Sequence, residues 1–261
     1  MTRRPPDPAA PSPLGLALLV LRDPKAAAQA CGRKGALASS LWIYGAFLAA
    51  FAVFTGLRPQ GFPGGQPVPF EFPAAGRLAL AILWNLPMEA VWIVFLMGLV
   101  RFFRVGSLPV RVALGAAWAA GALILLIAYL QLHGMSRAAF LVGTAVWLGL
   151  FYPLLRGIGR DEWLQVTGFM LALNAVFLAL ALPLTVSAVL RKEGAFMASQ
   201  IVMGLWLLWA GTSGLRELAA LRLPRAFMAI LLSIVFQAAL TLSLYAAGLV
   251  SREILMVMLF G

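Results

Sequence analysis

The chain alternates between long apolar stretches and short segments that carry most of its charges. Seven stretches have about the 20 apolar residues that an α-helix needs to cross the hydrocarbon layer of a membrane. They predict spans at 37–57, 78–100, 109–132, 137–155, 163–190, 196–215 and 226–249. The pattern therefore predicts an all-α fold, a polytopic transmembrane helical bundle of about seven spans that occupies residues 37–261.

Residues 1–36 precede the first span and have a different character. Residues 1–12 are rich in proline, which predicts a disordered cytoplasmic tail. The apolar run Leu14–Leu21 is too short to span, and Asp23-Pro24 after it is a pair that opens helices. We expect residues 13–35 to form one or two short amphipathic helices on the membrane surface, with a flexible leader as the alternative.

Composition agrees with a membrane location. The chain is 62% hydrophobic and 11% charged, whereas soluble domains carry about 25% charged residues. So little polar surface cannot cover a water-soluble fold, and most of the mass must lie in the bilayer. Richness in Ala, Gly, Arg and Pro is typical of GC-rich bacterial genomes, so we expect the bacterial cytoplasmic (inner) membrane.

The 20 Lys and Arg residues predict the orientation. Fourteen of them lie in the N-terminal segment and in the alternate connections on its side of the bundle, and six lie on the other side. Cytoplasmic loops carry the positive excess, so the N-terminus is predicted to be cytoplasmic and the C-terminus outside. Basic residues at span ends favour anionic lipid headgroups as partners over nucleic acid. The expected headgroup contacts are Arg101, Arg104, Arg111, Arg222 and Arg225.

The residues required for catalysis are scarce. Cys31 and His133 are the only cysteine and histidine, so neither an internal disulfide nor a zinc cage is expected. Neither a Ser/His/Asp set nor an HExxH, Walker or dinucleotide-binding motif occurs. We therefore expect a protein that is not an enzyme and that has neither a cofactor nor a metal site.

Four polar side chains fall inside predicted spans. Glu89 is eleven residues into the second span, near the expected midplane, and Asn85 lies one turn earlier on the same helix face. Asn174 and Gln237 lie near the middles of the fifth and seventh spans. These four residues are predicted to converge on one intramembrane polar site.

Two hypotheses explain this site. In the functional one, Glu89 binds a proton or cation, and Pro87 marks a broken helix of the transporter kind. In the structural one, Glu89 is protonated and hydrogen-bonds across the bundle, with the amides as further polar contacts. Both expect helix kinks at Pro87 and Pro183. The sequence favours the structural hypothesis, because transporters usually carry more intramembrane charge than a single Glu.

Two parts of the chain resemble a known family. The stretch Leu19–Ala27, an apolar run followed by Asp-Pro-Lys-Ala, resembles the opening of bacterial Yip-domain proteins, relatives of eukaryotic Rab-interacting membrane proteins. Trp206–Leu218 and Leu223–Ala226 are similar to that family's closing helix–loop–helix. The family typically has five spans, so this chain would add a hairpin around the fourth and fifth spans. The resemblance implies membrane shaping, adaptor or scaffold work without catalysis.

The leading functional hypothesis is therefore an inner-membrane protein of binding or scaffold type, Yip-like, that acts beside a membrane-protein partner or a second copy of itself. The alternative is a small transporter or channel subunit that uses the polar site around Glu89. The substitution Glu89→Gln separates them, because only the transporter would lose its function.

Overall fold

The computed structural model describes residues 11–59, 61–64, 79, 82–131, 135–252, 254 and 255. Within these ranges the regular structure is helical, without strands. The elements are α1 (Pro13–Arg22), α2 (Pro24–Cys31), α3 (Ala36–Leu57), α5 (Asn85–Arg104), α6 (Leu108–Gln131), α7 (Arg137–Gly149), α8 (Tyr152–Leu155), α9 (Arg160–Leu173), α10 (Ala175–Val189), α11 (Glu193–Ala219) and α12 (Leu223–Ala246).

Seven helical stretches are long and apolar enough to cross a membrane: α3, α5, α6, α7 with α8, α9 with α10, α11, and α12. The predicted multi-pass helical bundle is confirmed at this level. Most boundaries lie within a few residues of the expected ones, but α5 begins at Asn85, seven residues later than the predicted second span. The fourth and fifth spans are each divided into two helices.

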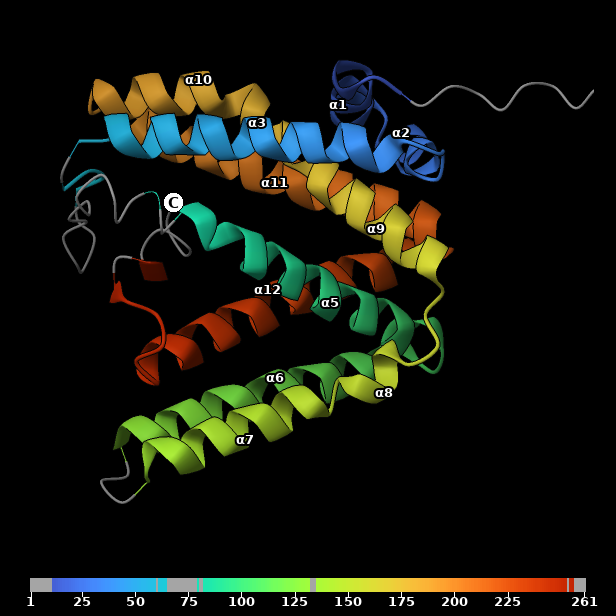
Figure 1. Cartoon of the computed structure of the whole chain (residues 1–261), viewed down its shortest axis with the longest axis vertical. Coiled ribbons are helices and arrows are strands. Elements are labelled where there is room, and N and C mark those ends of the chain that lie inside the picture. Colours follow the sequence, from blue (N-terminus) through green and yellow to red (C-terminus); the bar gives the residue numbers. More distant parts are fainter. Residues whose placement is uncertain are drawn as a thin grey trace, which may run out of the picture.

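The helices form three groups, which Figure 1 shows from top to bottom. One group contains α3, α9, α10 and α11, the middle one contains α5 and α12, and the third contains α6, α7 and α8. The largest fully buried side chains include Phe95 and Leu96 of α5 and Phe236 of α12, because this middle pair is covered on both sides. Apolar side chains on the outer helices stay exposed, as expected for a bundle with lipid as its solvent.

The N-terminal helices α1 and α2 pack on one end of the bundle (Figure 1). Asp23 caps α2 by accepting a hydrogen bond from the backbone N–H of Ala26 at 3.1 Å, so the predicted opening of a second short helix is confirmed. Leu16 and Val20 are fully buried against the bundle. The proline-rich residues 1–10 lie outside the described ranges, and contact of α1 with a membrane surface stays a prediction.

Hydrogen bonds tie together the segments that were predicted to be cytoplasmic. The Arg225 guanidinium donates to the carbonyls of Phe103 (2.7 Å), Arg104 (3.0 Å) and Gly106 (2.6 Å), which joins the start of α12 to the end of α5. Arg104 forms an ion pair with Glu162 at the start of α9. We call this part of the molecule the arginine end; Arg101, Arg104, Arg111, Arg222 and Arg225 define it.

Four of these five arginines bind acceptors or rings within the protein. Besides Arg225 and Arg104, Arg101 donates to the carbonyl of Arg156, and Arg111 donates to the carbonyl of Val105 at 3.2 Å and lies over the Phe102 ring. Arg222 is an exposed residue that precedes α12. These arginines therefore hold helix ends together, and their predicted contacts with lipid headgroups stay a prediction.

Candidate functional site

Glu89 is the fifth residue of α5, in the second turn of a 20-residue helix. The sequence pattern had predicted a position near the middle of its span, and the later start of α5 accounts for the difference. The beginning of α5 is nevertheless set back from the end of the bundle where α3 and α6 terminate (Figure 1). Glu89 therefore lies among neighbouring helices and not at the rim of the bundle.

The chain before α5 is interrupted at Trp84, which forms a turn between the helical residues Ile82 and Leu83 and the start of α5. Pro87 occupies the first turn of α5, where a helix does not need the N–H group that proline lacks. The proline removes the bond that the Leu83 carbonyl would otherwise accept. The Asn85 side-chain amide donates to the Ile82 carbonyl at 3.1 Å, so it forms a hydrogen bond across this interruption within its own span.

The fifth span is interrupted in the same manner at Asn174, between α9 and α10. The Asn174 side-chain amide donates to the Leu171 carbonyl at 3.2 Å, three residues earlier, as Asn85 does to Ile82. Pro183 lies inside a continuous α10. The interruption of this span therefore coincides with an asparagine that the sequence had assigned to a shared polar site, and the bend at Pro183 stays a prediction.

The Glu89 carboxyl has an unusual environment. Its Oε1 atom is out of contact with solvent and has no hydrogen-bond partner. The Tyr44 hydroxyl on α3 is also buried without a partner, and Tyr44 lies within electrostatic range of Glu89. No ion pair joins Glu89 to a basic residue within the described part of the chain. The cross-bundle hydrogen bond that the structural hypothesis requires is therefore absent for Oε1.

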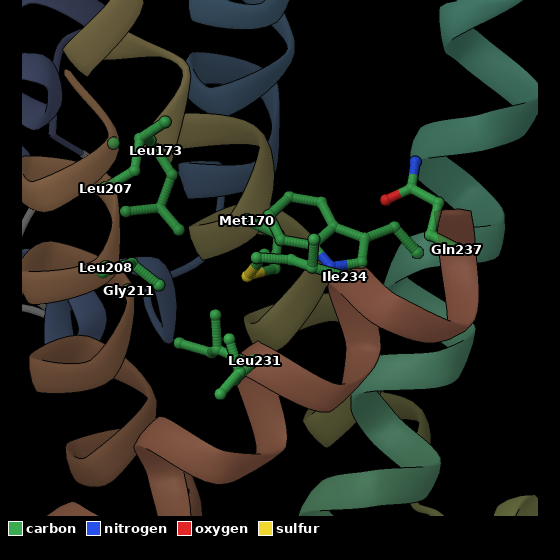
Figure 2. Close-up of a pocket in the computed structure, with 11 residues that line it drawn as sticks. Met170, Leu173, Leu207, Leu208, Gly211, Leu231, Ile234 and Gln237 are labelled. Carbon is green, nitrogen blue, oxygen red and sulfur yellow. The ribbon is translucent and has the colours of Figure 1, made fainter. Parts of the chain in front are cut away.

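A cavity of about 350 Å³ lies one helical turn from Glu89, between α5, α9, α11 and α12 (Figure 2). Trp92 lines it and donates from its indole N–H to the Ser233 hydroxyl at 2.9 Å, which joins α5 to α12. Gln237 of α12 is at the edge of the cavity (Figure 2). The rest of the lining is apolar: Met170, Leu173, Gly204, Leu207, Leu208, Gly211, Ile230, Leu231 and Ile234.

The predicted site is therefore only partly assembled. Glu89 and Gln237 lie on the neighbouring helices α5 and α12, whereas the amide donors of Asn85 and Asn174 are used within their own spans. Tyr44 was missed by the sequence reasoning. The signal was a phenol inside the first span, because a buried tyrosine hydroxyl normally needs a partner.

The candidate site offers one carboxyl, with one phenol within electrostatic range of it. The described residues contain no cluster of three or more His, Cys, Asp or Glu side chains suited to a metal ion. A single carboxyl in apolar surroundings is well suited to exchange a proton, which requires no further ligands. The Tyr44 hydroxyl is a donor that matches a carboxylate acceptor.

Comparison with known proteins gives no relative from which a role can be transferred: no family model, curated protein or solved structure matches this chain.

Proposed function

We propose that this chain is a small inner-membrane transport protein, or a subunit of one, that takes up and releases a proton at Glu89. The observation that carries the proposal is the buried Oε1 atom of Glu89 without a hydrogen-bond partner. An ionised side chain inside a membrane span is costly, so such residues are rare and usually functional. In this proposal the chain is not an enzyme, its N-terminus is cytoplasmic, and its C-terminus is outside.

Tyr44 supports the proposal because it supplies a second unpaired polar group from another helix. If the two groups served only packing, their hydrogen-bonding capacity would be expected to be satisfied, since an orphaned buried group costs about 1–3 kcal/mol. Loss of a proton from Glu89 would create a carboxylate to which the Tyr44 hydroxyl can donate. We therefore assign Tyr44 as a positioning residue for the ionised form of Glu89.

The test is proton flux in liposomes that contain the purified chain and a pH-sensitive dye. Under an imposed pH gradient, the wild type is expected to carry protons and Glu89→Gln to lose this flux, because Gln keeps the shape but cannot exchange a proton. Glu217→Gln is the matched control, since Glu217 is an exposed carboxylate bonded to Gln29 at the arginine end. Equal flux in the wild type and Glu89→Gln would contradict the proposal, as would a wild type without flux.

The second candidate function is the scaffold role that the Yip-like resemblance implies. It is supported by α11, the least buried of the seven candidate spans, which exposes large apolar side chains at every fourth position: Met197, Ile201, Leu205 and Trp209. A membrane helix of a partner, or a second copy, would fit such a stripe. Co-purification in mild detergent tests this role, and a monomer with no companion protein would count against it.

A further inference from the structure

A second cavity, of about 330 Å³, lies between α11 and α12 nearer the arginine end. Leu208 lines both this cavity and the one beside Trp92, so the two cavities are neighbours along the α11–α12 pair, and we call them together the α11–α12 groove. On α12 the groove runs from Leu223 to Gln237, which corresponds to roughly 21 Å of helix. One leaflet of a bilayer contributes about 15 Å of hydrocarbon, so the groove is long enough for a lipid chain to reach the midplane.

The groove is open because glycine replaces larger side chains on α11. A Cβ atom added at Gly204 would meet nothing within 4 Å, so the space beside it is empty of protein. Leu223 and Phe227 on the other wall are exposed, which places the groove on the outer surface of the bundle. Its walls are mostly apolar, and the polar side chains among its lining residues are Thr212 and Ser213 of α11 and Gln237 of α12.

Positive charge lies at the mouth of the groove. Arg222 immediately precedes the groove residues Leu223 and Pro224, and Arg216 follows Thr212 by one helical turn; both arginines are exposed. The nearby carboxylate of Glu217 is bonded to Gln29 of α2. An apolar groove below a pair of exposed arginines is complementary to an anionic phospholipid, which has apolar acyl chains and a negatively charged headgroup.

We infer that the α11–α12 groove is a binding site for one anionic phospholipid. Its acyl chain lies along Gly204 and Leu208, and its headgroup lies between Arg216 and Arg222. The inference is independent of the proton role of Glu89. The proposed orientation enters only in naming the cytoplasmic leaflet as the source of the lipid.

The test is native mass spectrometry of the purified chain in detergent, with added phosphatidylglycerol or phosphatidylcholine. The wild type is expected to retain one phosphatidylglycerol and to prefer it over phosphatidylcholine. Gly204→Leu fills the groove and should abolish retention. Gly45→Leu is the matched control, because Gly45 of α3 is exposed and, like Gly204, has nothing within 4 Å of an added Cβ. Arg222→Glu should weaken phosphatidylglycerol binding about fivefold or more through the lost headgroup attraction.

Three results would overturn the inference. One is equal retention of phosphatidylglycerol by Gly204→Leu and the wild type. Another is equal retention of both lipids by the wild type, which would indicate ordinary solvating lipid. The third is a dimer that Gly204→Leu dissociates, since a second copy would then occupy the groove. Arg222→Glu changes an exposed residue, so it keeps the test valid even if Gly204→Leu unfolds.

Discussion

At the scale of single residues, Arg58 and Glu89 show two ways in which a charged side chain sits in apolar surroundings. Arg58 follows α3 and is 4% exposed. It donates to the Phe62 carbonyl at 2.9 Å, and its guanidinium lies 5.9 Å and 5.5 Å from the ring centroids of Phe54 and Phe196. Burial lowers its pKa to about 10. Arg58 thus has a hydrogen-bond acceptor and two aromatic rings beside it, whereas Glu89 Oε1 has no hydrogen-bond partner. The position of Glu89 in apolar surroundings is therefore the less readily explained of the two.

Cys31 gives a prediction at the same scale. Burial raises the pKa of its thiol to about 12, so at pH 8 the native chain should hold about a thousandfold less thiolate than an exposed cysteine. Maleimide should therefore label Cys31 slowly in mild detergent and rapidly after denaturation in SDS. Labelling of the native chain at the rate of an exposed thiol would contradict the burial of Cys31.

The same thiol contributes to pH dependence. An unfolded cysteine loses its proton near pH 9, whereas the native thiol keeps it to about pH 12. Between these values the unfolded chain releases the Cys31 proton and the native chain does not, so the free energy of unfolding falls as the pH rises. Below this window Cys31 does not affect the free energy of unfolding. A Cys31→Ala variant should lose this part of the alkaline instability.

The sequence predicted only part of the candidate site. Glu89 was identifiable because a carboxyl in an apolar stretch stands out in any reading of the chain. The hydrogen bonds of Asn85 and Asn174 within their own spans were not identifiable. An amide that donates to a nearby carbonyl and an amide that donates to a distant partner look alike in a sequence. Tyr44 comes within electrostatic range of Glu89 because α3 and α5 both pack against α9, and hydropathy does not encode this packing.

At the scale of helices, hydropathy predicted the spans well because length and apolar content alone decide whether a helix can cross a membrane. Length and apolar content do not determine where a helix is interrupted within a span. A span stays apolar through Trp84 and Asn174, while a turn interrupts the regular helix at each of these residues. The late start of α5 was missed for this reason.

Gly214 provides a test of helix packing. A Cβ atom added there would lie 2.0 Å from Cζ of Phe169, a fully buried ring on α9. Gly214→Ala should therefore lower the free energy of unfolding by about 1–3 kcal/mol through overpacking. Thermal unfolding in detergent measures the effect.

Gly204→Ala is the control on the same helix, because an added Cβ there meets nothing within 4 Å. Alanine favours helix over glycine by about 1 kcal/mol, so this variant should be neutral or slightly more stable. Equal melting temperatures for the two variants would show that α9 and α11 do not approach each other as closely as the structure has them.

At the scale of the whole molecule, the arginine end joins segments that are far apart in the chain. Contacts between Arg225 and α5, between Arg104 and Glu162, and between Gln29 and Glu217 place four segments on one face. These are the segments that the positive-inside rule assigns to the cytoplasm. Their shared position is a property of the fold; the side of the membrane on which they lie is still a prediction.

Single cysteines test that orientation. In a Cys31→Ala background, Lys34→Cys should react with a membrane-impermeant maleimide only in inverted vesicles, and Lys192→Cys should react in intact spheroplasts. Both positions are exposed, and the lysines lie in segments that the charge pattern assigns to opposite sides. Labelling of both from the same side would disprove the alternation of spans.

The position of α12 has a consequence for how the protein is made. It is the most C-terminal of the described helices, yet it packs against α5 and α6 in the centre of the bundle, where it also contacts α11. During synthesis the earlier helices must enter the bilayer before their central neighbour exists. A ribosome stalled before residue 223 would leave the earlier helices in the membrane without the element that joins them, exposed to quality-control proteases until α12 arrives.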